Sequence, residues 1–562
     1  MKQIIECVPN FSEGRDLNII RQITDAIESV DGIELLNVDP GHATNRTVVT
    51  FVGEPEPVIE AAFRGAKKAA ELIDMSKHHG EHPRFGSIDV CPLIPISNIS
   101  MEKTAQYAHK LARRMGDELG ISVYCYEFAA TKPERKSLAN CRAGEYEGLK
   151  EKLQKPEWKP DYGPVELNIK AGASAVGTRN FLIAYNVNLN TTSTRRANAI
   201  AFDVREAGRI VREGDPLTGK IITDENGEPI RIPGTLKSVR AIGWFIKEYG
   251  IAQISMNLTD ITVTSVHQAF EEVCEKARER GMRVTGSELI GLIPLQAMLD
   301  AGKYFLKKQQ RSTGISDEEI IKIAIKSLGL DELAPFDPKK RIIEYVMEDK
   351  KERLIDMNLN VFVNETASES PAPGGGSVSA YVGSLGAALA TMVANLSSHK
   401  RGWEDRWKEF SDWAEKGKMY QEKLLKLVDE DTRAFNRIMD AFALPKENET
   451  EKKIRTESIQ AATKNAIEVP LEVMKAAFAS MEAIKAMAEI GNPNSVSDAG
   501  VGALCARTAV YGAFLNVKIN ASGLKDKVFV DRVMDEAGTI LQKTIQLEKE
   551  ILETVEGKMK IS

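Results

Sequence analysis

The sequence predicts a multidomain protein, in which two tandem α/β subdomains of the split βαβ type, a ferredoxin-like variant, precede an all-α helical bundle. Three observations lead to this fold class. The chain has 562 residues, more than one hydrophobic core normally serves. Strand-like and helix-like patterns alternate in its first part, and only long helical patterns follow. We therefore expect α/β subdomains at 1–178 and 179–328, a linker at 329–350 and a helical domain at 351–562.

The first subdomain shows the element order β-α-β-β-α-β. Short runs rich in β-branched residues predict strands, and apolar residues spaced three or four apart predict amphipathic helices. We expect strands at 4–10, 33–39, 46–53 and 87–96, helices at 17–30 and 55–77, and then a further helix at 101–119 and a strand at 121–127.

The same order of patterns recurs in the second subdomain, which suggests a duplication. We expect strands at 181–190, 238–246, 251–259 and 282–293, and helices at 192–211 and 261–281. Between them, the run 221–232 carries Asn226-Gly227 between β-prone residues, which is typical of a surface hairpin.

The C-terminal part is predicted to be a bundle of long helices. We expect these helices at 377–398, 402–443, 450–490, 495–520 and 526–557. The uncharged run Gly374–Ser398 is long enough to span a bilayer. It is rich in Ser, Gly and Ala, and small residues four apart let helix backbones approach closely, so we expect a buried helix of a soluble protein.

Composition narrows the class of protein. The net charge of −6 and the pI near 5.9 argue against a nucleic-acid-binding protein, which would show a dominant basic stripe. The six cysteines are scattered without CxxC spacing, so we expect reduced thiols and neither disulfides nor a zinc site. The N-terminus lacks the apolar segment of a signal peptide. These features predict a cytoplasmic protein.

The stretch HHGEHPRFGS, residues 78–87, holds three of the seven histidines. His78 and His82 are four apart, a spacing that binds zinc on a helix face. Gly80 and Pro83 oppose a helix, because Pro disfavours α geometry at the residue before it. We therefore expect a loop. A loop histidine can act as a general base near neutral pH, and a surface cluster that ends a helix fits the pattern equally well.

Asp431 interrupts the apolar face of the predicted helix 402–443. Apolar residues recur in steps of three and four on both sides of it, so that it should face the bundle interior, whereas Asp429 and Glu430 should turn toward solvent. A buried carboxylate is costly unless it is paired or functional, and burial raises its pKa, which suits proton transfer. The alternative is a structural carboxylate that pairs with an arginine such as Arg507 or caps a neighbouring helix.

The stretch SPAPGGGSV places Gly374, Gly375, Gly376 and Ser377 at the start of a predicted helix. The free N–H groups of a first helical turn can bind an anion or a planar polar ligand. A flexible domain junction explains the same Pro and Gly residues as well.

Other polar residues are weaker candidates for ligand binding: Asp39, Asn45, Arg46, Asp498, Asn516 and Asn520. Turn chemistry accounts for most residues in the stretch that holds the first three. Asp498 can be a helix N-cap. The two C-terminal asparagines lie four apart on one helix face, where they can hold a heteroaromatic ligand or bridge helices.

Long motifs make the N-terminal part resemble the glutamate formimidoyltransferase family: ECVPNFSEGR, TNRTVVTFVG, IDMSKHHGEHPRFGSIDVCPLIPI, RAGEYEGL, PDYGP, AIGWF and GLIPL. The C-terminal part resembles formimidoyltetrahydrofolate cyclodeaminase through APGGGSVSA, LVDEDTRAF, SDAGVGA and YGAFLNVKIN. The match covers nearly the whole chain, in the domain order of the bifunctional family.

The resemblance implies two consecutive folate reactions of histidine degradation. The formimino group of N-formimino-L-glutamate moves to tetrahydrofolate, and 5-formimino-tetrahydrofolate then cyclises to 5,10-methenyl-tetrahydrofolate and ammonia. The family's transferase base falls on His82 and its cyclodeaminase acid on Asp431. Its folate-binding stretch falls on residues 163–172, whose ends, Gly163, Pro164 and Gly172, match.

The resemblance also implies the cosubstrate and the assembly. Tetrahydrofolate, with a polyglutamate tail, is a cosubstrate, and neither reaction needs a metal. Arg46 is a candidate anchor for a substrate carboxylate. The family forms a ring of dimers, so we expect a homo-oligomer.

Two alternatives stay open at this point. The helical domain can instead be a methenyltetrahydrofolate cyclohydrolase, an activity of related helical domains. The chain can also be a folate-binding scaffold with decayed catalysis, although intact His82 and Asp431 speak against that. The roles of His78 and His79, and direct transfer of the intermediate between sites, are not fixed by the sequence.

Overall fold

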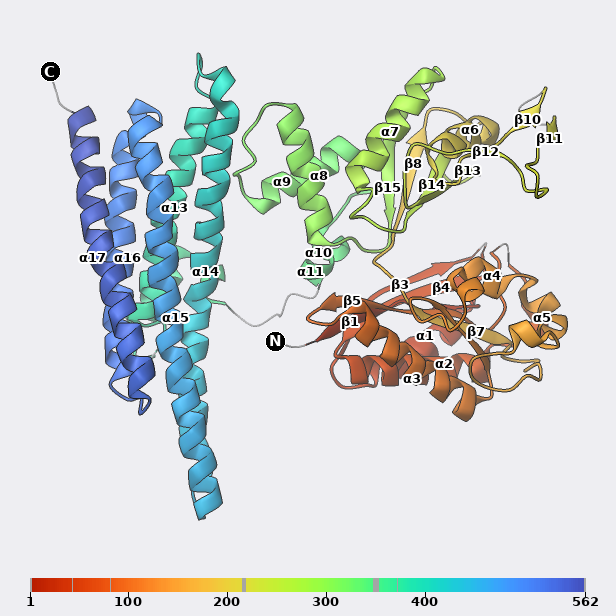
Figure 1. Ribbon diagram of the computed structural model, residues 1–562, viewed down its shortest axis with the longest axis horizontal. Helices are drawn as coiled ribbons and strands as arrows, with labels where there is room; N and C mark the ends of the chain where they lie inside the picture. Colours follow the sequence, from red (N-terminus) through yellow and green to blue (C-terminus); the bar gives the residue numbers. More distant parts are fainter. Residues whose placement is uncertain are drawn as a thin grey trace. The chain divides into compact units, whose positions relative to one another are not determined.

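Figure 1 shows the computed structural model, which describes residues 3–42, 44–80, 82–214, 219–346, 353–370 and 372–559. These residues form two compact units. The first unit holds both α/β folds up to Ala301 and resumes at Leu328, and the second holds Gly302–Ser327 and the helices from Leu354 onward. Two α/β parts followed by a largely helical part are what the sequence predicts.

The first sheet has seven strands in the described part of the chain. β1 (Ile4–Cys7) and β2 (Asn10–Phe11) lie end to end, since each pairs with both β4 and β5. Pro9 separates them because it has no N–H to donate to a neighbouring strand. The other strands are β3 (Ile33–Gly41), β4 (Arg46–Gly53), β5 (Ile88–Ser97), β6 (Ser122–Glu127) and β7 (Ala173–Thr178).

The order across this sheet is β3-β4-β1/β2-β5-β7-β6, with β5, β7 and β6 parallel. Three helices cover one face and bury the apolar core between themselves and the strands: α1 (Leu17–Glu28), α2 (Pro55–Leu72) and α3 (Met101–Leu119). On the other face, α4 (Leu138–Arg142) and α5 (Glu145–Leu153) pack against the aromatic side chains of Phe85 and Tyr124.

The elements predicted for the first subdomain are present, and one further strand was not predicted. β7 has the sequence ASAVGT, and all six residues are buried. Its small side chains give little hydrophobic pattern, because strand prediction depends on bulky apolar residues. The strand is fixed by pairing with β5 and β6 on both sides.

The second sheet is antiparallel with the order β13-β14-β8-β15. Its strands and helices are β8 (Ile183–Leu189), α6 (Thr194–Val204), β13 (Val239–Ile246), β14 (Ile251–Leu258), α7 (Val266–Glu279) and β15 (Val284–Ile290). The helix predicted at 192–211 ends at Val204, where the C-cap residue Arg205 adopts an extended conformation with a ψ of 145°. Residues beyond it form β9 (Arg209–Ile210).

The predicted hairpin is confirmed. Short strands flank it: β10 (Arg212–Glu213), β11 (Lys220–Ile221) and β12 (Arg231–Ile232). The amide of Asp224 donates to Glu228 O at 2.8 Å, and that of Gly227 donates to Asp224 O at 3.0 Å, which closes the turn. Gly227 has a φ of 82°, as an Asn-Gly turn requires.

Shorter helices precede the bundle: α8 (Leu295–Lys308), α9 (Asp317–Leu328), α10 (Pro338–Arg341), α11 (Ile343–Val346) and α12 (Leu359–Thr366). Of these, α8, α9 and α12 were not predicted. α8 and α9 approach closely at Gly302, where an added Cβ would lie 2.2 Å from Ile320 O. The linker region is packed: the amide of Ile343 donates to Ile293 O at 3.0 Å.

The bundle consists of the five predicted helices: α13 (Gly375–Ser398), α14 (Trp407–Ala443), α15 (Glu449–Ile490), α16 (Val496–Ala521) and α17 (Lys527–Lys558). α13 is long and apolar enough to cross a membrane, but it packs against α14, α15 and α16, which confirms the predicted bundle helix. Gly383 permits this packing, because a Cβ added at this position would lie only 3.0 Å from the Ala509 methyl group. The α14–α15 turn projects beyond the neighbouring helices (Figure 1).

Gly86, two residues before β5, allows a test of the sheet packing. A Cβ at Gly86 would lie 1.9 Å from Ala173 O, which is backbone of β7. We expect Gly86→Ala to destabilise the first sheet by about 1–3 kcal/mol, because the strands must separate. Gly148→Ala is the control: it meets nothing within 4 Å, and in a helix it should stabilise by about 0.5–1 kcal/mol. Hydrogen exchange at β5 and β7 amides measures both, and equal protection in the two variants would contradict the prediction.

Candidate active sites

The histidine-rich stretch is a loop, as predicted, between a short 3-10 turn at Met75–Lys77 and β5. His78 is buried, and its Nε2 lies 2.9 Å from Asn45 O. Arg84 Nε donates to His78 Nδ1 at 3.3 Å. Because both ring nitrogens of His78 are engaged, this histidine holds the loop together and is not free to take part in chemistry.

His82 is half-buried, and its Nδ1 lies 2.7 Å from the carbonyl oxygen of Pro83. A carbonyl can only accept, which favours the tautomer with its proton on Nδ1. Arg46 Nη1 lies 3.0 Å from the same Nδ1, and because a guanidinium can only donate, this contact favours the other tautomer. Burial, followed by the charge of Arg46, lowers the pKa of His82 from 6.5 to about 4. The imidazole is therefore neutral at physiological pH, the form that a general base needs.

Two guanidinium groups meet at one carboxylate beside His82. Asp89 is fully buried at the start of β5, and its Oδ2 accepts from Arg46 Nη1 and, at 2.7 Å, from Arg142 Nη2. Its Oδ1 accepts from the amide of Phe85 at 3.2 Å. Arg46 also donates from Nε and Nη2 to Asn10 Oδ1, at 3.0 and 2.6 Å. The site thus combines a neutral base with two fixed cations.

The other candidate residues of the first subdomain, Asp39, Asn45 and Arg46, differ in their surroundings. Asn45 is structural: its Oδ1 accepts from the Gly14 amide at 3.0 Å, and its Nδ2 donates to His79 O at 3.0 Å. Asp39 pairs with Val48 on the neighbouring strand, and Arg46 lies two residues before Val48. Asp39 and Arg46 therefore lie on the same face of the sheet.

The ends of the stretch 163–172 have close backbone contacts. Pro164 O accepts from Ser122 Oγ at 2.8 Å, and a Cβ at Gly163 would lie 2.1 Å from Ile121 O. Gly172 bridges to Gly86 in the loop that carries His82. The stretch therefore runs along the ends of β6 and β7 and finishes next to that loop.

A cavity of about 480 Å³ opens beside the loop, and it is lined by His79, Gly80, Arg84, Gly144, Glu145 and Glu147. Arg84 pairs with Glu147 at 2.7 Å and with Glu145 at 3.1 Å. His79 reaches this cavity, whereas His78 does not line it.

The ionisation of His82 can be measured directly. In the intact protein we expect the His82 imidazole resonances, assigned by their loss in His82→Ala, to titrate near pH 4. Arg46→Met should raise this pKa, because it removes the strongest repulsive charge. NMR titration of the ring protons tests both, and a midpoint near 6.5 in the unmodified protein would overturn the assignment.

The second site lies at the N-terminus of α13. Asp431 on α14 accepts from Ser377 Oγ at 3.1 Å through Oδ2. Ser377 is fully buried and also approaches Val428 O at 2.9 Å and Thr432 Oγ1 at 3.2 Å. A Cβ at Gly376 would lie 2.2 Å from Asp431 Oδ1, so the carboxylate packs directly against the glycine backbone.

Burial raises the pKa of Asp431, and the bonds from the Ser377 side chain and amide oppose the rise without cancelling it. Arg507 is not its partner, since Arg507 pairs with Glu548 at 3.1 Å. The expectation that Asp429 faces solvent is wrong. Asp429 is 8% exposed and accepts from the Leu354 amide at 2.7 Å, because residues before the bundle cover that side of α14.

The remaining predicted residues divide between this site and other places. A Cβ at Gly375 would lie 3.3 Å from Asn516 Nδ2, so Asn516 on α16 belongs to the site. Gly374 is the N-cap residue of α13. Asn520 donates to Ala466 O at 2.8 Å and bridges two helices. Asp498 lies in the first turn of α16, roughly 27 Å along that helix from Asn516.

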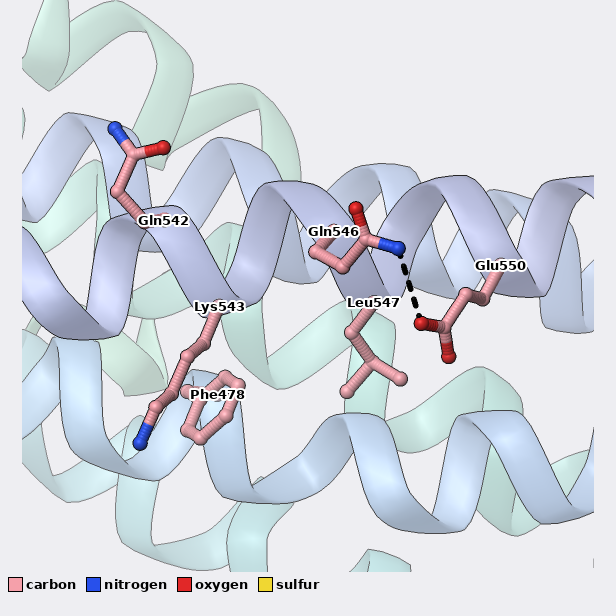
Figure 2. Close-up of a pocket in the computed structure, with 6 residues that line it drawn as sticks. All are labelled: Phe478, Gln542, Lys543, Gln546, Leu547 and Glu550. Atoms are coloured by element: carbon pink, nitrogen blue, oxygen red, sulfur yellow. Dashed lines mark hydrogen bonds between the residues drawn. The ribbon is translucent and has the colours of Figure 1, made fainter.

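A groove between α15 and α17 contains none of the candidate site residues (Figure 2). Its volume is about 380 Å³, and its lining residues are Phe478, Gln542, Lys543, Gln546, Leu547 and Glu550. Gln546 and Glu550 bond to each other at 3.1 Å, and Lys485 pairs with Glu550 at 3.0 Å. We assign it no role.

Sequence reasoning missed Asp89, Arg142 and Asn10. A charged residue within the apolar strand SIDVCPLIPI was the available indication for Asp89, because a buried charge needs a partner. Arg142 lies in RAGEYEGL, a stretch recognised as a motif without a role for any of its residues. Asn10 lies in ECVPNFSEGR, likewise a motif in which no role was given to this residue.

The close contact at Gly376 makes a further testable point. Gly376→Ala should displace the Asp431 carboxylate, because its added methyl overlaps both carboxylate oxygens. Gly375→Ala is the matched control, one residue away, with its nearest contact at 3.3 Å. We expect the first variant to lose the activity of this site at least 10-fold and the second to retain most of it. A crystal structure of Gly376→Ala with Asp431 unmoved would contradict the prediction.

Known protein families match the two α/β parts and the helical part of the chain separately. The family model described as "Formiminotransferase domain, N-terminal subdomain" matches residues 4–179, "Formiminotransferase domain" matches 184–348, and "Formiminotransferase-cyclodeaminase" matches 358–539.

Curated relatives match the whole chain or one part of it. A formimidoyltransferase-cyclodeaminase of Mus musculus is 42% identical over 545 residues, 97% of each chain. A glutamate formimidoyltransferase of Thermoplasma acidophilum is 43% identical over 54% of this chain and 92% of its own. A methenyltetrahydrofolate cyclohydrolase of Methylorubrum extorquens is 35% identical over 36% of this chain and 97% of its own. From matches of this extent and identity, the chain belongs to the formimidoyltransferase-cyclodeaminase family.

Proposed function

We propose that this chain carries out two consecutive folate reactions of histidine degradation. It transfers the formimino group of N-formimino-L-glutamate to tetrahydrofolate and then converts 5-formimino-tetrahydrofolate to 5,10-methenyl-tetrahydrofolate and ammonia. The observation that carries the proposal is that one chain of this family holds a neutral loop imidazole beside fixed cations and, in its other unit, a half-buried carboxyl at a helix N-terminus.

In the transfer step, nitrogen 5 of tetrahydrofolate attacks the formimino carbon and forms a tetrahedral intermediate. The attacking nitrogen must lose a proton, and the glutamate nitrogen must gain one before the bond to carbon breaks. His82 can take the first proton on its unprotonated ring nitrogen and deliver it to the departing nitrogen, because its imidazole is neutral. One imidazole therefore completes the proton balance.

In the second step, nitrogen 10 attacks the formimino carbon on nitrogen 5 and closes a five-membered ring. The former imino nitrogen gains the proton that nitrogen 10 gives up, and it needs a second proton to leave as ammonia. Asp431 is suited to supply it, because burial raises its pKa and so favours the protonated acid. Asn516 and the N-terminal turn of α13 lie where they can orient the folate ring.

Tetrahydrofolate is the cosubstrate in this proposal, and proton transfer with proximity accounts for both steps without a metal. We further propose that it carries a polyglutamate tail, because a tethered intermediate has a high effective concentration at the second site.

A homo-oligomer in the cytoplasm is also part of the proposal. Exposed apolar side chains gather on the outer faces of two neighbouring helices, α13 and α16: Leu385, Met392, Leu396, Val501, Leu504, Leu515 and Ile519. An apolar face of this kind is typical of a subunit interface. The six free thiols suit a reducing compartment.

We infer that both α/β subdomains are ferredoxin-like variants. The order β13-β14-β8-β15 supports this, and β3-β4-β1-β5 gives the same order of strands in the first sheet. In each, the first and third strands of a β-α-β-β-α-β unit lie at the centre.

The relative named as a cyclohydrolase supports one alternative for the helical unit. A cyclohydrolase would consume 5,10-methenyl-tetrahydrofolate by adding water and would release no ammonia. Incubating the protein with each folate, and following methenyl absorbance and ammonia, separates the two activities.

The two reactions should be separable by single substitutions. His82→Ala should reduce formimino transfer at least 100-fold, because no base accepts the proton, while supplied 5-formimino-tetrahydrofolate still cyclises. Asp431→Asn should show the reverse and accumulate 5-formimino-tetrahydrofolate. Methenyl absorbance and ammonia release measure both, and each variant is the folding control for the other. Normal transfer by His82→Ala, or prompt ammonia release by Asp431→Asn, would refute the corresponding assignment.

A further inference from the structure

Beside His82, two arginines, Arg46 and Arg142, share a single carboxylate, that of Asp89. Arg46 and Arg142 share Oδ2 of Asp89, and Asp89 is fully buried. The guanidinium side chains are themselves 10% and 13% exposed. In the described part of the chain, the cluster therefore retains one uncompensated positive charge in a largely buried setting, and a buried charge of this kind is costly unless a ligand pairs with it.

The two arginines differ in how many donors are already used. Arg46 commits Nε and Nη2 to Asn10 and Nη1 to Asp89. Arg142 donates to Asp89 from Nη2, while its buried Nε has no hydrogen-bond partner among the residues the structure describes. Arg142 thus keeps donor capacity that a bound anion can take up.

Arg84 shows what a purely structural arginine looks like in the same loop. It is as buried as Arg46, but Glu147 and Glu145 pair with it, and its remaining donors go to His78. Its charge is therefore compensated. This makes Arg84 a matched control for the neighbouring cation cluster.

We propose that Arg142, held with Arg46 by Asp89, binds the α-carboxylate of the formimino donor next to His82. The inference rests on the proposed transferase function and names the subsite for one of its substrates. A planar guanidinium with free donors matches a carboxylate in geometry as well as in charge.

The covalent structure of the substrates selects the donor over the folate. In N-formimino-L-glutamate the α-carboxylate is three bonds from the formimino carbon, so a donor that reacts at His82 must place this carboxylate beside it. Arg46 Nη1 is 3.0 Å from His82 Nδ1 and also bonds to the carboxylate that holds Arg142. The carboxylates of tetrahydrofolate lie at the far end of its aminobenzoyl group from nitrogen 5.

Donor binding then activates the base. In the free protein the charges of Arg46 and Arg142 both lower the pKa of His82. A bound carboxylate compensates these charges, so the imidazole becomes more basic when the donor is in place. The acid limb of kcat/KM, which reports the free protein, should therefore lie at lower pH than the acid limb of kcat.

The test compares two donors that differ only in the α-carboxylate: N-formimino-L-glutamate and N-formimino-4-aminobutyrate. The unmodified protein should prefer the first by about 10- to 100-fold in kcat/KM, the loss expected when a charged hydrogen bond is missing. Arg142→Met should reduce this preference to within about 3-fold, and Arg142→Lys should keep part of it. Arg84→Lys should leave the preference unchanged, whatever it does to the rate.

The outcomes are distinct. If Arg142→Met lowers kcat/KM for both donors equally, Arg142 is only structural and the proposal falls. If instead the KM for tetrahydrofolate rises, the subsite serves a folate carboxylate. If the unmodified protein transfers nothing, the proposed function fails, and calorimetric binding of glutamate against 4-aminobutyrate still decides the subsite. Should Arg142→Met not fold, the Lys variant and the separation of the two pH limbs carry the test.

Discussion

The transferase site depends on one buried carboxylate. Asp89 has no exposed surface, and it is tolerated there because Arg46, Arg142 and the Phe85 amide all donate to it. Removing one partner from such a buried pair typically costs about 3–5 kcal/mol. Since Arg46 comes from β4, Arg142 from α4 and Phe85 from the histidine-rich loop, the carboxylate joins three segments, and the position of His82 follows from theirs.

The two sites shift ionisation in opposite directions for complementary purposes. At His82, burial and cations lower the pKa, so the imidazole stays neutral and can accept a proton. At Asp431, burial raises the pKa and outweighs the bonds from Ser377, so the carboxyl favours the form that can donate one. The proposed reactions need a base first and an acid second. Each environment therefore stabilises the neutral form that its step requires.

Sequence reasoning identified the principal group at each candidate site by different routes. The helix-face pattern singled out Asp431, and the structure places it against Gly376 and Ser377. Local pattern left His82 equal to a surface cluster, and the family resemblance selected it. The same helix-face argument failed at Asp429, because a helix inside a bundle is covered on more than one side. A simple division into inner and outer faces does not apply there.

The sequence by itself determined most elements, including the five bundle helices, because periodicity, caps and turn residues act over a few neighbouring positions. Only the tertiary structure decided which polar groups meet. Asp89 binds arginines 43 and 53 residues away, and no local pattern encodes such a pairing. The contacts of Asn516 and Asn520, which share a helix face, were likewise decided only by the tertiary structure. The first lies against the glycine turn and the second bridges to Ala466, because the neighbouring helix differs at each height.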